Sequence, residues 1–349
     1  MQRQPGPFPA LAACALLALG VLAAAPPRVS AETTAAARGV PFITLRNRTG
    51  ETAPRTYFGD ARGALSAGWC GIRETVLPIP PGLVAAAPFH VPDEILRVGE
   101  IREEPVATVL DGLAVTADGA DPVLYTHGFY VDFDKGCRRA TMLQEGAGLT
   151  GRFMWFSWPS DGALLNYTRD EADLYWSVPD LADVIGDMAL RFGPGRVGVA
   201  GHSLGARGVV LALYDVAGRH PDVRIGDVVL LAPDIDFDTF RKLLPRIRPL
   251  VRSLTVYVAD ADRPLALSAQ LHGYPRLGET GNDVALLEGV EVIDISDIPV
   301  RSPTGHLYHI YNPEVWDELD QLLNEGKGAT ERRNLVQRGP NLWALEPAE

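Results

Sequence analysis

The distribution of apolar residues changes near residue 121 of the chain. Beyond that point, short and uninterrupted apolar runs alternate with longer stretches in which apolar and polar residues are mixed. An uninterrupted apolar run of four to eight residues is typical of a strand buried on both faces, whereas the mixed stretches are typical of amphipathic helices. The alternation predicts a mostly parallel, doubly wound α/β sheet with helices on both faces. The predicted strands cover residues 122–126, 152–157, 197–200, 227–234 with its exit loop, 253–259 and 290–295.

The segment before residue 121 has a different pattern. Residues 40–109 are rich in Pro and Gly and contain only short apolar pieces, and Pro105–Leu110 is a further piece at their end. Such pieces between turn residues indicate antiparallel strands and loops at one edge of the sheet. We therefore predict a single domain over residues 40–325, with N-terminal edge strands and loops over 40–120.

Two further predictions concern a long helix and the C-terminal end. Residues 168–192 have a helical pattern that contains Pro179. Because Pro has no backbone N–H and its ring clashes with the preceding turn, we expect the helix to break or restart there. The polar residues 326–349 are expected to form a loose tail.

The N-terminal residues have the pattern of a secretory signal peptide. Arg3 precedes the apolar run Leu11–Ala25, and Val29–Ala31 resembles a cleavage site. We predict a signal peptide over residues 1–31 and a disordered lead-in over 32–39, hence a secreted or periplasmic protein. The apolar run is short for a membrane span, so no stable span is expected after cleavage, and an uncleaved N-terminal anchor is the alternative.

Composition excludes some classes of function. The 349-residue chain is 46% hydrophobic and has a net charge of −12 without a basic run, which argues against nucleic acid as a partner. Cys and His residues show no metal-ligand spacing, so we expect neither a metal nor another cofactor. Cys70 and Cys137 remain after signal cleavage and permit either one disulfide or two free thiols. Nothing in the sequence decides the oligomeric state.

The main candidate for chemistry is the pentapeptide Gly201–Gly205, of the form Gly-x-Ser-x-Gly. It lies between a Val-rich predicted strand and a predicted helix, the context of a nucleophile elbow. In an elbow the serine occupies a strained turn that exposes its hydroxyl beyond the carboxyl end of the strand. Ser203 is therefore the candidate nucleophile.

A serine hydroxyl needs a base to remove its proton and an acid to orient that base. In this architecture the acid and then the base follow the serine along the chain. His306, in a loop after the last predicted strand, is the candidate base, and His309 is the alternative. The candidate acids are the aspartates that follow two successive predicted strands, and spacing does not choose among them. They are Asp234, Asp236, Asp260 and Asp262.

Two backbone N–H groups are needed to stabilise the negative oxygen of an acyl-transfer intermediate. One candidate is the amide of Leu204, the residue after the nucleophile. The other is the amide of Phe129, in the loop after the strand that precedes His127. His127 itself is expected to be structural, since it precedes Ser203 in the chain.

From about Tyr57 to Tyr311 the chain resembles the α/β-hydrolase family called DUF900, whose function is unknown. The resemblance rests on six segments, residues 127–129, 156–160, 201–205, 232–236, 257–268 and 305–308. It implies an α/β-hydrolase fold and a serine hydrolase, with Asp262 as the acid and His306 as the base.

The chain departs from the family pattern at three positions. Leu204, Arg207 and Pro264 stand where the family usually has Met, Asn and Ala. The change at Leu204 is harmless if only its N–H is used. Pro264 stiffens the turn after Asp262, which keeps Asp260 as an alternative acid.

These observations favour a serine hydrolase that cleaves a carboxylic ester, or a thioester or amide, of a small acyl substrate. Trp158, Tyr130 and Tyr167 are candidates for lining an apolar acyl pocket, or else core aromatics. Two alternatives stay open: a non-catalytic envelope protein that binds ligands with the hydrolase fold, and an acyltransferase that uses an acceptor other than water.

Overall fold

The computed structural model describes residues 38–74, 96–163, 166–302 and 304–347. The described residues belong to one compact unit, Ala37–Glu349. The predicted signal peptide and nearly all of the predicted lead-in lie outside the described residues. None of the described helices combines the length and apolar character that crossing a membrane requires.

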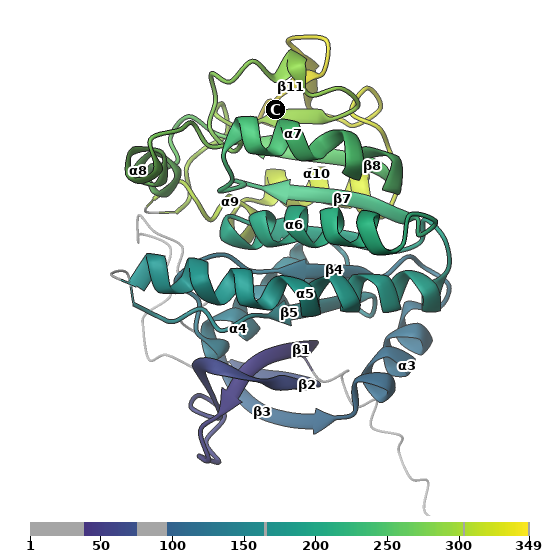
Figure 1. The fold of residues 1–349 in the computed structure, drawn as a ribbon, viewed down its shortest axis with the longest axis vertical. Helices are drawn as coiled ribbons and strands as arrows, with labels where there is room; N and C mark the ends of the chain where they lie inside the picture. The colour runs from purple at the N-terminus through teal and green to yellow at the C-terminus, as the bar shows by residue number, and fades with distance from the viewer. Residues whose placement is uncertain (1–37, 75–95, 164–165, 303, 348–349) are drawn as a thin grey trace, which may run out of the picture. The chain divides into compact units, whose positions relative to one another are not determined.

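The described strands form one sheet in the order β10-β11-β9-β8-β7-β6-β4-β5-β1-β2-β3 (Figure 1). Neighbours from β1 through β5, β4, β6, β7, β8 and β9 to β11 are parallel. The pairs β1–β2, β2–β3 and β10–β11 are antiparallel. The predicted sheet, with its antiparallel N-terminal edge, is confirmed. The strands are β1 (Gly39–Arg48), β2 (Phe58–Glu74), β3 (Leu96–Glu104), β4 (Val123–Thr126), β5 (Phe153–Ser157), β6 (Gly198–His202), β7 (Ile225–Leu231), β8 (Val251–Val258), β9 (Glu291–Asp294), β10 (Leu335–Gln337) and β11 (Leu342–Leu345).

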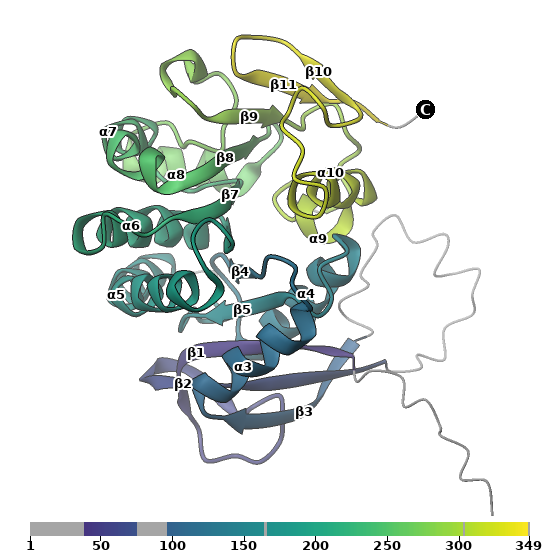
Figure 2. The same cartoon turned by 90° about the vertical axis from the view of Figure 1, so that its right-hand side faces the viewer.

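Helices cover both faces of this sheet. Figure 2 shows α5, α6 and α7 on one side and α4, α9 and α10 on the other. The helices are α3 (Val106–Ala117), α4 (Phe133–Gly146), α5 (Tyr167–Phe192), α6 (Leu204–Arg219), α7 (Phe237–Ile247), α8 (Arg263–His272), α9 (Tyr308–Tyr311) and α10 (Pro313–Leu323), with short 3₁₀ turns at Arg248–Leu250 and Val284–Leu286.

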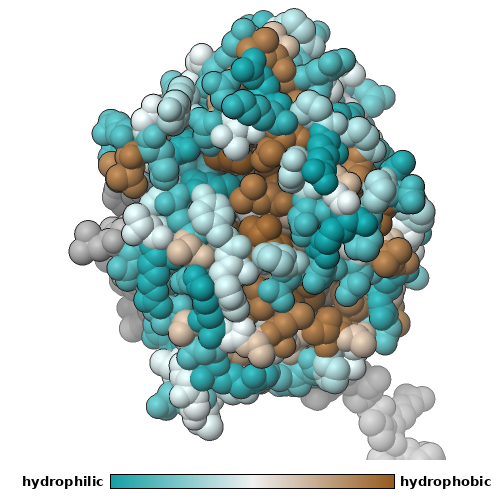
Figure 3. All heavy atoms as spheres, viewed as in Figure 1, coloured by the Kyte–Doolittle hydropathy of each residue, from teal (hydrophilic) through white to brown (hydrophobic). Residues whose placement is uncertain are grey.

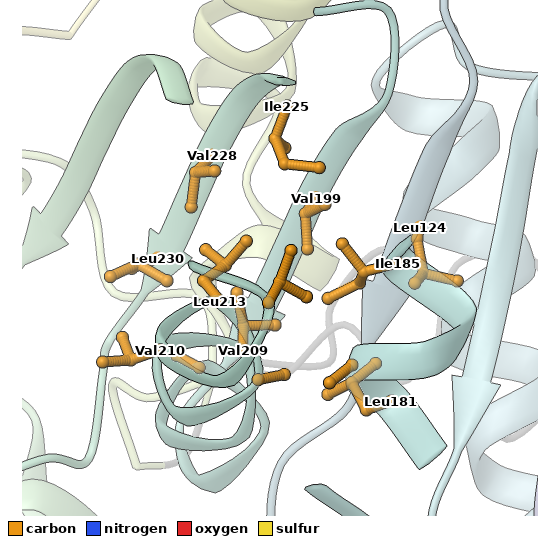
Figure 4. Close-up of a cluster of buried hydrophobic side chains, with 14 of the residues drawn as sticks. Leu124, Leu181, Ile185, Val199, Val209, Val210, Leu213, Ile225, Val228 and Leu230 are labelled. Atoms are coloured by element: carbon orange, nitrogen blue, oxygen red, sulfur yellow. The ribbon is translucent and has the colours of Figure 1, made fainter. Parts of the chain in front are cut away.

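The central strands are apolar on both faces because each face meets helices. On β7, Val228 and Leu230 pack into the cluster shared with α5 and α6, whereas Val229 and Leu231 belong to the cluster on the opposite face. Figure 4 shows the first of these clusters, which also contains Val209 of α6. Burying one such aliphatic side chain contributes about 1.5–3 kcal/mol. The outer surface over α5, α6 and α7 is largely polar, with apolar atoms visible between polar side chains (Figure 3).

The prediction of a strand at Pro105–Leu110 is wrong, because this segment starts helix α3. Pro105 is the N-cap, and the buried residues Val109, Leu110, Leu113 and Ala117 recur at helical spacing. Their packing against the sheet outweighs the local strand preference of the β-branched residues.

The predicted break at Pro179 is also absent. Helix α5 runs without interruption from Tyr167 to Phe192. A Pro inside a helix costs about 3 kcal/mol, through one lost hydrogen bond and a clash with the preceding turn. Buried residues on both sides of Pro179, among them Leu174 and Ile185, offset this cost by packing on the same core.

The prediction of a loose C-terminal tail is contradicted by strands β10 and β11. Strand β11 pairs in parallel with β9, and β10 pairs with β11. Trp343 and Leu345 of β11 are buried. The Arg332 side chain is wholly buried, donates to Glu318 at 2.6 Å and also pairs with Glu291. The polar composition of the tail concealed an ion pair that is satisfied only inside the fold.

Cys70 and Cys137 form a disulfide. Cys70 in β2 and Cys137 in α4 have their Cα atoms 6.4 Å apart and are joined through their sulfurs. Both residues are fully buried in the cluster that β1 and β2 share with α4. The bond therefore ties the antiparallel edge of the sheet to a helix of the parallel part.

We expect reduction of this disulfide to lower the free energy of unfolding by about 2–4 kcal/mol, because it releases a long loop in the unfolded chain. Urea unfolding followed by circular dichroism, with and without a thiol reductant, measures the difference. The double variant Cys70→Ala, Cys137→Ala is the control and should not respond to the reductant. Equal midpoints for the oxidised and reduced wild-type protein would contradict the expectation.

Candidate active site

Ser203 occupies a sharp turn between β6 and α6. Its backbone has φ 54° and ψ −121°, a strained conformation for a residue with a side chain. The turn depends on the two flanking glycines. A Cβ at Gly201 would lie 2.7 Å from Ala206 Cα, and one at Gly205 would overlap the carbonyl oxygens of Thr126 and His127. The strand-turn-helix context expected for the Gly-x-Ser-x-Gly segment is therefore present.

A loop after β9 carries His306 to Asp262. Gly305 has φ +74°, and a Cβ there would lie 2.5 Å from the Ala261 carbonyl oxygen. This close approach lets His306 Nδ1 donate to Asp262 Oδ2 at 2.6 Å. The other carboxylate oxygen of Asp262 accepts from the Leu265 amide at 3.0 Å and caps α8. Both oxygens are thus used, which fixes the carboxylate and, through it, the imidazole ring.

The other candidate acids make different contacts. Asp260 is exposed, and its backbone amide donates to Ser296 Oγ. Asp236 caps α7 by accepting from the Thr239 amide. Asp234 is buried, but among the described residues its carboxylate contacts a tyrosine, a serine and two arginines and no histidine. These partners are Tyr167, Ser268, Arg207 and Arg276. The structure thus joins His306 to Asp262.

Two further histidines pack behind His306. His202, the residue before Ser203, forms a hydrogen bond between Nε2 and the His306 carbonyl oxygen at 3.0 Å. Its ring lies 4.5 Å from that of His306 and 4.1 Å from that of His309. His309, the alternative base, shares a hydrogen bond with Tyr125 Oη at 3.0 Å. Burial holds the pKa values of His202 and His309 well below the usual range, so both are neutral and add no positive charge behind His306.

The loop after β4 passes directly beside Ser203. A Cβ at Gly128 would lie 2.9 Å from Ser203 Cβ, and Phe129 is the next residue in the chain. Within the described residues, neither the Phe129 amide nor the Leu204 amide donates to a protein acceptor. Within the described part of the chain, these two backbone donors are therefore without a protein acceptor.

His127 and Trp158 form the support of this loop. Trp158 Nε1 donates to the His127 carbonyl oxygen at 2.7 Å, and the two rings stack with centroids 5.1 Å apart. Burial lowers the pKa of His127 to about 3, so its ring is neutral. Trp158 is fully buried, which excludes it from the acyl-pocket residues suggested by the sequence. Tyr130 and Tyr167 are partly exposed.

The fold agrees with the family to which the sequence is matched. Residues 108–325 match the family described as "Alpha/beta hydrolase of unknown function (DUF900)". This match covers more than half of the chain. The protein belongs to the DUF900 family of α/β hydrolases. A comparison with curated proteins found no match.

Several solved structures are similar to this DUF900 hydrolase in fold. One is the lin2722 gene product of Listeria innocua, with 13% identity and a TM-score of 0.40, covering 65% of this chain and 99% of that one. Another is the carboxylesterase CesB (YbfK) of Bacillus subtilis, with 13% identity, a TM-score of 0.32 and coverage of 60% and 85%. A third is Est1E of Butyrivibrio proteoclasticus, with 12% identity, a TM-score of 0.37 and coverage of 59% and 88%.

Sequence reasoning missed a polar network beside the site of this DUF900 protein. Arg207 of α6 donates through Nε to the Asp234 carbonyl oxygen at 2.5 Å and pairs with Glu171. Tyr167 Oη donates to Asp234 Oδ2 at 2.6 Å, and its ring lies 5.3 Å from that of Phe129 in an edge-to-face contact. The available signal was Arg207 itself, a long cation in the otherwise apolar first part of α6. The network fixes the polar end of Tyr167 and leaves its ring beside Phe129.

A second missed group is Asp170, at the start of α5. It accepts from Ser160 Oγ at 2.5 Å and from the Asp161 amide at 3.0 Å. Burial nevertheless raises the pKa of Asp170 to about 6. Ser160 in turn accepts from the Val131 amide, so this carboxylate is linked to the loop that contains Phe129.

Among the described residues, no group of side chains is arranged to hold a metal ion.

The raised pKa of Asp170 predicts a pH-dependent stability. The folded protein binds a proton at Asp170 more tightly than the unfolded chain does, because an Asp in an unfolded chain has a pKa of about 3.9. The resulting stabilisation of the folded protein is complete at pH values below the pKa of the unfolded chain, and it is lost as pH rises through about 6. Relative to Asp170→Asn, the wild type should therefore become more stable as pH falls from 7 to 4.5, roughly the range between these two values.

Urea unfolding of both proteins at several pH values in this range measures the effect. The Asn variant has no titrating group at position 170 and serves as the reference for all other titrations. Stability curves that remain parallel across the range would contradict the prediction.

Proposed function

We propose that this α/β hydrolase is a serine hydrolase that cleaves a carboxylic ester through an acyl-enzyme. Ser203 is the nucleophile, His306 the general base and acid, and Asp262 the group that orients His306. The amides of Leu204 and Phe129 bind the oxyanion. The observation that supports this most strongly is the 2.6 Å hydrogen bond between His306 and Asp262 at the sheet rim where Ser203 lies.

The chemistry follows from the roles of these groups. Ser203 Oγ attacks the ester carbonyl carbon while His306 Nε2 accepts the hydroxyl proton, and the carbonyl oxygen becomes negative. The two amides stabilise this oxygen by hydrogen bonds that need no rearrangement. The intermediate then expels the alcohol, which takes the proton from His306. A water molecule attacks the acyl-enzyme by the same steps and releases the acid.

The elements adjacent in the sheet support the proposal that these groups act together. Strand β6 pairs with β4 on one side and with β7 on the other. The loop after β4 therefore lies beside Ser203, and the exit of β8, which carries Asp262, is one strand beyond β7. His202 connects the two sides, because it precedes Ser203 and binds the His306 backbone.

The partly exposed rings of Phe129 and Tyr167 support an apolar acyl group as the part of the substrate next to Ser203. We propose an ester in preference to an amide, since its alcohol leaves more readily. Thioester cleavage, transfer to another acceptor and binding without catalysis are distinct outcomes of the experiment below.

We also propose that the protein works outside the cytoplasm. The buried disulfide between Cys70 and Cys137 supports an oxidising compartment, where such bonds persist. The predicted signal peptide points to the same compartment.

The test of the catalytic roles combines a fluorophosphonate probe with hydrolysis of short p-nitrophenyl esters. The wild type should be labelled and should hydrolyse the ester, and Ser203→Ala should do neither. Asp262→Asn should lower kcat by about 10²–10⁴-fold, because the imidazole loses its orientation and its anionic partner.

Asp260→Asn is the matched control, since Asp260 is an exposed carboxylate in the same turn and should leave kcat unchanged. Labelling that persists in Ser203→Ala, or equal losses in the two Asp variants, would overturn the assignment. Labelling without ester hydrolysis would point to a different acyl substrate or acceptor. A wild type that is neither labelled nor active would favour the binding protein.

A further inference from the structure

A buried arginine contacts two loops next to the proposed site. Arg46 of β1 is almost completely inaccessible, and its guanidinium reaches across the carboxyl end of β5. Nε donates to Ser157 Oγ at 2.9 Å, and Nη1 donates to the Ser160 and Gly59 carbonyl oxygens at 2.7 and 3.2 Å. Nη2 donates to the Val131 carbonyl oxygen at 2.6 Å. One side chain therefore binds the loops after β4 and β5 together.

This charge is costly to bury. The hydrogen-bond acceptors of Arg46 are one hydroxyl and three carbonyls, so no carboxylate contacts the guanidinium. Burial lowers the pKa of Arg46 to about 10, against the opposing effect of nearby carboxylates such as Asp132 and Asp170, and the guanidinium is still positive at neutral pH. Removing an ion from water is unfavourable, and apolar residues of similar volume are often at least as stable in its place. Core packing alone does not explain an arginine at this position.

The loop that Arg46 binds is strained next to the proposed oxyanion donor. Tyr130 follows Phe129 and has φ 64°, a left-handed conformation that is costly for an aromatic residue. The peptides on both sides of Val131 are held, since the Val131 amide donates to Ser160 Oγ at 3.1 Å and the Val131 carbonyl accepts from Arg46. These bonds oppose relaxation of Tyr130. A change in its φ would turn the Phe129–Tyr130 peptide, which adjoins the peptide that carries the Phe129 N–H.

We propose that Arg46 is a positioning residue of the active site, which holds the loop 127–132 in the conformation that presents the Phe129 amide to the substrate oxygen. The catalytic part of this inference rests on the proposed serine hydrolase, whereas the clamping of the loop does not. Arg46 lies outside residues 108–325, the part that matches the family. The N-terminal strands would thus supply a part of the catalytic apparatus.

The experiment compares Arg46→Lys and Arg46→Gln with Arg332→Lys. Lysine keeps the charge but cannot bridge the two loops with a planar fork of donors. Glutamine removes the buried charge, so this variant can still be tested if the lysine variant does not fold. Arg332 is also a wholly buried arginine, but it binds Glu318 and Glu291 in the C-terminal part of the fold. It is the matched control for loss of a buried guanidinium.

Two readouts separate positioning from general stability. Amide hydrogen–deuterium exchange should accelerate at least about tenfold in residues 127–132 of both Arg46 variants, and not in Arg332→Lys, because only the clamp opens locally. With a p-nitrophenyl ester, kcat should fall by about 10–100-fold at nearly unchanged KM, and a boronic acid that mimics the tetrahedral intermediate should bind more weakly by a similar factor.

Each outcome decides one part of the proposal. Unchanged exchange in residues 127–132 would overturn the role of Arg46, and so would an acceleration that spreads evenly over the chain. Accelerated loop exchange with unchanged kcat and boronic acid affinity would show a clamp without a catalytic role and overturn the inference. A wild type without hydrolase activity would refute the proposed function, while the exchange data would still decide whether Arg46 holds the loop.

Discussion

The active-site region depends on one steric constraint, the close approach of helix α6 to the loop after β4. There is no room for a side chain at Gly205, because the Thr126 and His127 carbonyl oxygens occupy that space. The approach forces Ser203 into its strained turn and places Gly128 against it. Ser203 and the loop that contains Phe129 are therefore positioned by the same contact. Strain of this kind persists only where the surrounding packing determines it, and here β6 is buried throughout its length.

The interior around the site holds charges in three different ways. Asp262 is satisfied by an imidazole and a helix amide, which leaves it a single well-defined geometry. Arg207 and Asp234 belong to a network of charges and hydroxyls that fixes the start of α5 and the turn after β7. Arg46 is bound by uncharged oxygens only. Buried charges contribute little net stability, but each restricts the geometry of the groups that satisfy it.

The segments outside the family match are integrated into the same sheet. Strand β1 pairs in parallel with β5 and carries Arg46, and the disulfide ties β2 to α4. At the other end, β11 continues the parallel sheet beyond β9 and Arg332 enters the interior. The two additions therefore share the core of the hydrolase domain.

The sequence by itself determined the elements whose cause is local. The parallel strands follow from apolar runs buried on both faces, and the elbow follows from two glycines around a serine between a strand and a helix. The capping of α7 by Asp236 likewise depends on residues within one turn. Each of these features could be predicted because the interactions that produce it lie close together along the chain.

Only the tertiary structure decided the features that depend on distant partners. Asp262 and His306 are separated by 44 positions, and the other candidate acids differ from Asp262 in their contacts and burial, which the sequence does not reveal. Pro179 stays within a helix, residues 106–117 form a helix, and residues 335–345 form strands, because packing outweighs local preference. Arg46 had no signal in the sequence, since its role arises from carbonyl groups about 85 and 114 residues away. Hydrogen bonds to backbone oxygens leave no pattern of residue types, and for that physical reason only the folded chain reveals them.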